Sequence, residues 1–378
     1  MRAKSVFIPT FMQNSGTLGR ASYLYVKFNA LSTPWFGLPS FALFASGLGI
    51  LGLLLFGTGS SGCTSKPDGV EAVVDSAAEL LRLNAQIEAQ PQNPDAWFAR
   101  SRYFARNQLF DKASNDANQA LTIDSLRADI WLHLADLSFT TKKVEDAAMQ
   151  IEKALAIEPE GADANLRMAE LQYYLGKYPE TFKHLDVVIR QNPYQPRAYF
   201  TKGMAFKEMG DTGLAISSFQ TATEQDPGYF HAWIQLGQLH AAKRSDLAIL
   251  YFKNAIDVNP SKQESYYALA YYYQQTGRVT EAMSTYLQLL ELDPQHVPSM
   301  HNLGFLLLFE KNQADEALVW FDKALNLDPE FIQAQYHRGY CLEFLGQKSE
   351  ARQAYQAALA LDPQMALAQQ GLSRVQGK

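Results

Sequence analysis

The sequence predicts an all-α fold, a solenoid of about eight helix-turn-helix repeats that follows an N-terminal signal or anchor segment. Three observations predict it. The chain repeats itself every 34 residues or so, small residues recur at fixed places of that period, and proline recurs at another. A period of this length is typical of stacked repeats, in which each copy buries its apolar face against its neighbours.

The N-terminal segment differs in composition from everything that follows it. Residues 1–34 form a basic leader, and residues 1–63 together contain four bases and no acid. From Trp35 to Phe56 the chain is almost entirely apolar. A bilayer-spanning helix needs about 20 such residues, whereas a secretory signal needs about 7–15 after a basic start. Residues 35–63 therefore fit either a signal peptide or a transmembrane anchor.

Small residues fill positions 57–62 and lead directly into Cys63. This arrangement resembles the lipobox of bacterial lipoproteins, and the resemblance implies that Cys63 is the lipidation site and the N-terminus after cleavage. The sequence departs from that family at Ser60, where leucine is usual, and in its long leader. A start codon assigned too early, with Met12 or a later site as the true start, is one explanation of the leader. The uncleaved anchor remains the alternative.

The bases that precede the apolar run keep the start of the chain in the cytosol, so the remainder is expected outside it. Residues 64–93 are a linker and an N-terminal capping helix, with helical periodicity from Val70 to Ala89 and a break at Pro91. Residues 366–378 are a C-terminal capping helix. Such caps cover the open apolar faces of terminal repeats.

Between residues 94 and 363 the sequence contains eight copies of one pattern. The copies are 94–127, 128–161, 162–195, 196–229, 230–262, 263–296, 297–331 and 332–365. One copy is a residue short and one is a residue long. Both changes are expected in turns, because a one-residue slip inside a helix rotates its packing face by about 100°.

Three places, numbered along each copy after allowing for the one-residue length changes, hold the same kind of residue throughout the repeats. The eighth place holds only small residues: Ser101, Ala135, Ala169, Gly203, Gly237, Ala270, Gly304 and Gly339. The twentieth place holds alanine in seven copies and Thr181 in the other. The thirty-second holds proline in seven copies and Ser125 in the first. Small residues allow two helices to approach closely, and proline ends the second helix.

This code resembles the tetratricopeptide repeat, and the resemblance covers residues 94–363. It implies a right-handed superhelix of antiparallel helix pairs whose concave wall is built by the first helices. The sequence departs from the family at the seventh place, where Arg100, Lys202 and Arg338 replace the usual apolar residue. The family's role implies a protein or peptide partner bound in the concave groove.

When the family's wall positions are carried over to this sequence, the residues that they assign to the concave wall change in character along the chain. The early part of the wall mixes apolar residues with acids, whereas its last three copies are aromatic. The predicted peptide-binding groove consists of Tyr267, Tyr271, His301, Phe305, Tyr336 and Tyr340. Exposed aromatic clusters usually mark contact sites. The alternative is that these rings pack against the neighbouring hairpin or the C-terminal cap.

The sequence supplies no candidate for catalysis, a metal or a cofactor. Cys63 and Cys341 are the only cysteines, which excludes a disulfide framework, and Cys341 is predicted to be a small core residue. The seven histidines are scattered over six copies without the spacing of a metal site. Residues 64–378 hold 29 bases and 39 acids, and such an acidic body argues against nucleic-acid binding.

These patterns predict a membrane-anchored, extracytoplasmic scaffold or adaptor for protein–protein interactions in bacterial envelope assembly, and not an enzyme. The expected location is the periplasmic side of the cell envelope, with an outer-membrane lipoprotein favoured over a single-pass inner-membrane protein. The alternative function is a glycan-binding component of an outer-membrane uptake or export system, in which the late aromatic rings stack on sugars.

Overall fold

The computed structural model describes residues 68–377, and within that range the chain is entirely helical, with 18 α-helices and no strand. The helices are α1 (Asp68–Ala89), α2 (Pro94–Arg106), α3 (Phe110–Ile123), α4 (Ala128–Thr140), α5 (Val144–Ile157), α6 (Ala162–Tyr174), α7 (Tyr178–Gln191), α8 (Pro196–Glu208), α9 (Thr212–Gln225), α10 (Phe230–Ala242), α11 (Leu247–Val258), α12 (Gln263–Gln275), α13 (Val279–Leu292), α14 (Val297–Phe309), α15 (Ala314–Leu327), α16 (Ile332–Phe344), α17 (Lys348–Leu361) and α18 (Ala366–Gln376). The predicted fold class is confirmed.

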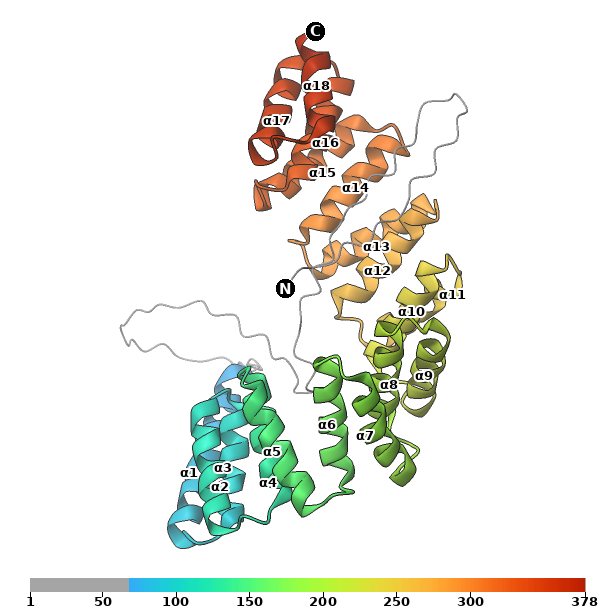
Figure 1. The fold of residues 1–378 in the computed structure, drawn as a ribbon. Coiled ribbons are helices and arrows are strands. Elements are labelled where there is room, and N and C mark those ends of the chain that lie inside the picture. The colour runs from blue at the N-terminus through green and yellow to red at the C-terminus, as the bar shows by residue number, and fades with distance from the viewer. Residues whose placement is uncertain (1–67, 378) are drawn as a thin grey trace, which may run out of the picture. The chain divides into compact units, whose positions relative to one another are not determined.

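Helices α2 to α17 form eight hairpins in chain order, and each hairpin packs on the next one (Figure 1). Each helix makes its most extensive contacts with its partner in the same hairpin. Every first helix begins at the residue where a sequence copy begins, from Pro94 of α2 to Ile332 of α16. Helix α1 packs on α2 at one end, and α18 packs on α17 at the other.

The turn inside each hairpin uses one residue in the left-handed region. Glycine occupies it in four copies, with φ between 71° and 83°: Gly176, Gly210, Gly277 and Gly346. The other four copies hold the same conformation with Gln108, Lys142, Arg244 and Asn312. Both one-residue length changes lie in such turns, beside Arg244 and Asn312, so no helix changes its packing face.

The turn between hairpins is held by two hydrogen bonds that recur along the chain. In one copy the Asp226 carboxylate accepts from the backbone N–H of Gly228 at 2.9 Å, and Trp233 Nε1 donates to the Pro227 carbonyl at 2.8 Å. Trp97 and Trp131 donate to the corresponding carbonyls of the preceding turns at 2.9 and 3.0 Å. These three tryptophans of the first helices therefore stabilise the turns between hairpins in addition to packing against their neighbours.

Glycine at the eighth place lies directly under an aromatic ring of the second helix. A Cβ built on Gly203 would lie 2.7 Å from the Phe219 ring, and one built on Gly237 would lie 2.4 Å from the Phe252 ring. Gly304 and Gly339 have the same relation to Phe321 and Tyr355. These contacts leave no room for a methyl group.

Where the eighth place is larger, most copies have a smaller residue at the ring's place. Ala135 shares a core cluster with Ile151, and Ala169 shares one with Leu185. In these two copies the combined volume of the two side chains is thus close to that of glycine with phenylalanine. The sixth copy is the exception, because Ala270 accompanies the fully buried Tyr286.

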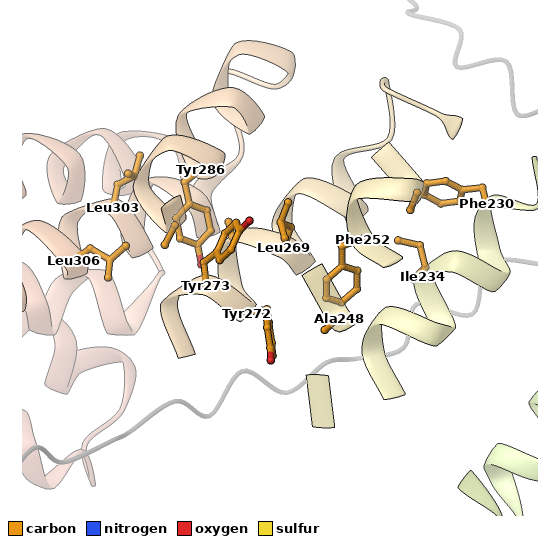
Figure 2. Packing of buried hydrophobic residues seen from close by; sticks show 13 residues of the cluster. Phe230, Ile234, Ala248, Phe252, Leu269, Tyr272, Tyr273, Tyr286, Leu303 and Leu306 are labelled. Carbon is orange, nitrogen blue, oxygen red and sulfur yellow. The ribbon is translucent and has the colours of Figure 1, made fainter. Parts of the chain in front are cut away.

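Several core clusters extend across more than one hairpin. The largest cluster runs from Phe230 and Ile234 of α10, through Phe252 and Tyr286, to Leu303 of α14 (Figure 2). A single hairpin would leave one apolar face open, so the stacking of neighbours completes each core.

Ion pairs explain two of the departures at the seventh place, one inside a hairpin and the other between consecutive hairpins. Arg100 of α2 forms a bidentate ion pair with Asp116 of α3, with N···O distances of 2.7 and 2.8 Å. Arg338 of α16 lies 2.6 Å from Asp322 of α15. In both places an arginine and an aspartate of the next helix or the helix before it form a charged contact where the family has an apolar residue.

The basic leader, the Trp35–Phe56 run and Cys63 lie outside the described residues, so those predictions stay predictions. None of the helices between Asp68 and Gln376 is both long and apolar enough to cross a bilayer.

The substitution Gly203→Ala should lower the free energy of unfolding by about 1–3 kcal/mol, because its methyl group would overlap the Phe219 ring. The check is the urea midpoint of the helical circular dichroism signal. Gly213→Ala in α9 is the matched control, because its Cβ meets only Asp211 Oδ1 at 3.6 Å. The control should leave the midpoint unchanged or raise it slightly. Equal midpoints for the two variants would contradict the close approach.

Candidate functional site

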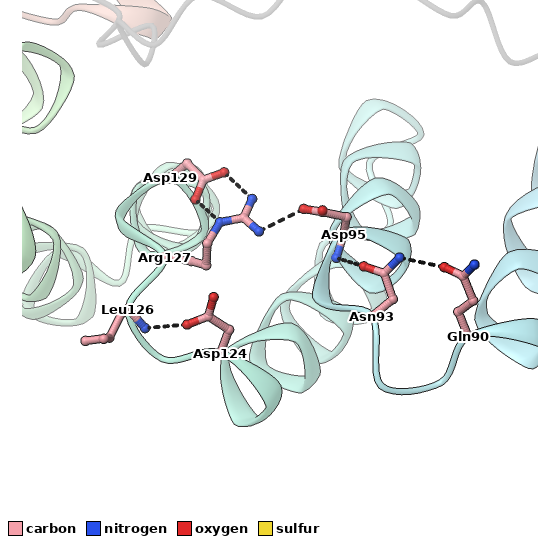
Figure 3. A network of polar contacts seen from close by, with 7 residues as sticks. All are labelled: Gln90, Asn93, Asp95, Asp124, Leu126, Arg127 and Asp129. Atoms are coloured by element: carbon pink, nitrogen blue, oxygen red, sulfur yellow. Dashed lines mark hydrogen bonds and ion pairs between the residues drawn. The ribbon is translucent and has the colours of Figure 1, made fainter.

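In the early copies, ion pairs join the first helices to one another. Arg127, just before α4, donates to Asp95 of α2 at 2.8 Å and to Asp129 of its own helix at 2.8 and 2.9 Å (Figure 3). Arg167 of α6 makes a bidentate ion pair with Asp136 of α4, and both N···O distances are 2.8 Å.

The same arrangement continues one step further, where Arg197 of α8 donates to Glu170 of α6 at 2.7 Å. Burial raises the pKa of the Glu170 carboxyl, although the neighbouring arginine acts in the opposite direction. Most of the acids that the sequence places on the early wall are therefore already bound to arginines of the same wall.

The late first helices have almost no charge. Helices α10 and α14 contain no aspartate, glutamate, lysine or arginine, and α12 contains only Glu264. On α16, Arg338 is paired with Asp322, and Glu343 is paired with Arg374 of α18 at 2.7 Å. The wall thus changes from ion-paired to uncharged and aromatic along the chain.

The six predicted groove residues lie in pairs on α12, α14 and α16, but they differ in burial. His301 and Tyr336 are buried, with 7% and 9% of their surface exposed. The remaining four side chains are partly exposed, namely Tyr267, Tyr271, Phe305 and Tyr340.

The rings form two separate clusters. In the first, Tyr267 stacks on Tyr271 with centroids 6.1 Å apart, and it also contacts Tyr286 and His296. The second lies on α14 and α16. It includes Phe305, Phe309, His337, Tyr340, His301 and Tyr336, with centroid distances between 4.7 and 6.5 Å. Many of the rings thus pack partly against a neighbouring hairpin, as the alternative interpretation expects, while four of the six predicted side chains keep exposed surface.

A chain of hydrogen bonds connects the two clusters across three repeats. Tyr286 donates to Gln274 at 2.8 Å and accepts from the Asn302 amide at 2.9 Å. Asn302 Oδ1 lies 3.2 Å from His301 Nδ1, and His301 Nε2 lies 2.9 Å from His337 Nδ1. Burial lowers the pKa of His301 to about 4 and that of His337 well below its usual value, so both rings are neutral at pH 7.

Sequence reasoning missed Asn302, Phe309 and His337. Asn302 and His337 occupy the sixth place of consecutive first helices, each directly after a predicted groove residue, and only three-dimensional stacking brings them together. Phe309 had a usable signal, because it lies four residues after Phe305 and therefore on the same helix face. It is 39% exposed.

The predicted core role of Cys341 agrees with its environment. The side chain is fully buried, its Sγ lies 2.8 Å from the Ala314 carbonyl as a donor, and burial raises its pKa to about 12. A thiol held in this way is unreactive. Among residues 68–377, no group of three or more histidine, cysteine, aspartate or glutamate side chains is arranged to hold a metal ion.

A solenoid of close-packed helical hairpins, whose wall of first helices changes from ion-paired to aromatic along the chain, is typical of a protein-interaction scaffold. Models of the tetratricopeptide repeat match residues 196–229, 263–296, 285–319 and 332–365, and a TPR repeat model matches residues 306–343. The matched copies are therefore tetratricopeptide repeats, as the sequence pattern predicts.

Two curated relatives and one solved structure illustrate the similarity. Human protein O-mannosyl-transferase TMTC3 is 23% identical over 67% of this chain and 24% of its own length. The TPR repeat-containing protein YpiA of Bacillus subtilis is 21% identical over 65% of this chain and 58% of its own length. The crystal structure of the C-terminal part of a TPR repeat-containing protein from Cytophaga hutchinsonii has a TM-score of 0.56 and 22% identity. It covers 64% of this chain and 99% of that one.

The structural similarity shows the shared fold alone. The alignments span between 7% and 39% of human Superkiller complex protein 3, TMTC3 and the human mitochondrial import receptor subunit TOM70. The chain therefore spans only part of the length of each of those relatives.

Acidification should destabilise the late repeats, because the unfolded chain takes up a proton on His301 that the folded chain excludes. The folded pKa of about 4 lies below the ordinary value of 6.5, so the His301 contribution is present above pH 6.5 and is lost as the pH falls toward 4. Between pH 7 and pH 4.5 this one residue should cost about 2 kcal/mol of unfolding free energy.

Urea titrations of the wild type and of His301→Phe at the two pH values measure this contribution. The variant is expected to be less stable at pH 7 but to lose about 2 kcal/mol less on acidification. Identical pH dependence of the two chains would show that the imidazole is not held neutral.

Proposed function

We propose that this chain is a membrane-tethered adaptor on the extracytoplasmic side of a bacterial membrane. Its last three repeats bind an apolar or aromatic peptide segment of a partner protein. The role that fits such an adaptor is the assembly of envelope components, where a tethered repeat domain holds one protein beside another.

The observation that carries the proposal is the change in the first helices from an ion-paired wall to an uncharged aromatic one. Arg127, Arg167 and Arg197 already occupy the acids of the early copies, so that part has few charges free for a partner. In the late copies, Tyr271, Phe305 and Tyr340 keep part of their ring surface exposed. Exposed aromatic groups of this kind are typical of protein contact sites.

The proposed tether is supported by the composition of residues 1–63. A basic leader, the apolar run of residues 35–56 and the small residues before Cys63 together fit a lipoprotein signal, or else an uncleaved anchor. Either one would hold the repeats beside the membrane, outside the cytosol.

The double substitution of Tyr271 and Tyr340 by alanine should weaken partner binding about 10- to 100-fold, the scale of losing two central aromatic contacts. The measurement is recovery of cross-linked partners by the full chain from detergent-solubilised membranes, with helicity followed by circular dichroism. Tyr194→Ala removes a tyrosine that is 77% exposed in the turn before α8, and it serves as the matched control.

A double variant that keeps its helicity but loses the partner supports the proposal, provided that the control retains it. Loss of helicity would assign the two rings to the packing of the hairpins. Undiminished capture by a folded double variant would contradict the proposal.

Mass spectrometry of the mature protein should show an N-terminal peptide that begins at a diacylated Cys63. Cys63→Ser should then abolish the lipid mass and leave the precursor uncleaved. A recovered peptide that spans Trp35–Phe56 from the mature wild type would contradict lipidation and support the uncleaved anchor.

A further inference from the structure

One surface of the late repeats combines exposed rings with a single uncharged acceptor. This surface, called here the Phe309 patch, consists of Phe305 and Phe309 of α14 and His337 and Tyr340 of α16. Phe309 lies edge-on to His337 with centroids 5.7 Å apart, and 5.4 Å from Tyr340. Phe305 lies edge-on to His337 at 5.5 Å. Phe309 is 39% exposed, and Phe305, His337 and Tyr340 are partly exposed.

The hydrogen-bond chain assigns the proton positions on the two imidazoles. The Asn302 amide nitrogen donates to Tyr286, so the Asn302 oxygen is the atom that faces His301 Nδ1. His301 Nδ1 must then carry the hydrogen, which leaves His301 Nε2 as an acceptor. The hydrogen between the two rings therefore belongs to His337 Nδ1.

A neutral His337 with its hydrogen on Nδ1 has a bare lone pair on Nε2. Within residues 68–377, His337 Nε2 has no hydrogen-bond partner. The tautomer cannot invert cheaply, because inversion would break the bonds that run through His301, Asn302 and Tyr286. The patch thus presents a preset acceptor.

The two helices that carry the patch hold no unpaired charged side chain. Helix α14 has no charged side chain, and on α16 Arg338 and Glu343 are held by Asp322 and Arg374. Neither helix therefore offers an unpaired carboxylate to offset the desolvation of an incoming ammonium or guanidinium group. A purely apolar side chain would cover the Nε2 lone pair and leave it without a donor, which costs about 1–3 kcal/mol.

We infer that the Phe309 patch binds a tryptophan or tyrosine side chain of the partner segment, whose N–H or O–H donates to His337 Nε2. The partner ring then packs against the edges and faces of Phe305, Phe309 and Tyr340, where aromatic pairs gain beyond simple burial. This inference rests on the proposed peptide-binding function and specifies the residue that the late repeats recognise.

The test starts from a random twelve-residue peptide library displayed on phage and selected on the full chain in detergent micelles. Selected peptides should be enriched in tryptophan or tyrosine. One selected tryptophan peptide is then compared by calorimetry with two copies, one carrying phenylalanine and one carrying 1-methyltryptophan, which keeps the ring and lacks the donor. The wild-type chain should bind the tryptophan peptide about 5- to 100-fold more tightly than either copy.

The same three peptides are measured on His337→Phe, which keeps a ring and removes the acceptor, and on His337→Gln, which keeps an acceptor amide. The preference for the donor should fall to near one on H337F and recover in part on H337Q. If H337F does not fold, the wild-type ratio and its loss on Phe309→Ala decide the question. Phe309 makes no hydrogen bond through its side chain, so its removal tests the patch without disturbing the polar chain.

A donor preference that survives in a folded H337F chain overturns the inference, as does selection of phenylalanine, leucine, lysine or arginine in place of tryptophan or tyrosine. In both cases the proposed function stands if Tyr271→Ala with Tyr340→Ala still abolishes peptide binding. Peptide binding that is insensitive to those two substitutions would instead refute the proposed function itself.

Discussion

The fold depends on one constraint, which is how closely the two helices of a hairpin can approach at the eighth place. In four of the last five copies a phenylalanine or tyrosine ring of the second helix covers a glycine of the first, with no space for a Cβ. Interiors at crystal-like density cannot absorb an extra methyl group without moving backbone. The crossing of each pair therefore sets which face of the first helix contributes to the wall. Because the crossing is repeated, these faces are aligned along the eight copies.

This alignment gives side chains on successive first helices a regular spacing, and the chain uses it in two ways. In the early copies the spacing places an arginine of one first helix beside a carboxylate of the preceding first helix. The charged groups of the early wall are therefore paired with one another. In the late copies the same places hold rings and neutral polar groups. The early ion pairs thus join the first helices to one another, whereas the late rings leave apolar surface for the proposed partner.

Much of the fold followed from the sequence because glycine, alanine and proline act through local sterics. Their recurrence gave the hairpins and the turns, including the two length changes. The left-handed turn residue was recognisable only where it was glycine, since Gln108, Lys142, Arg244 and Asn312 carry no such signal.

The site was less predictable, because burial on a wall depends on what the neighbouring copies bring. His301 and Phe305 lie one turn apart on the same helix face, yet one is 7% exposed and the other is partly open. The difference comes from Phe331 and His337, which pack on His301 from further along the chain. No periodic rule on a single copy contains that information, and the Asn302–His301–His337 chain is invisible for the same reason.

The polar chain from Gln274 to His337 also bears on how the molecule comes apart. A solenoid normally unravels from its ends, one repeat at a time, because each copy touches only its neighbours. Here five side chains from the sixth, seventh and eighth copies satisfy one another in a buried setting, and freeing the last hairpin would strip His301 of its partner. The C-terminal third should therefore open as one block with a shared protection against amide exchange, whereas fraying is left to the opposite end.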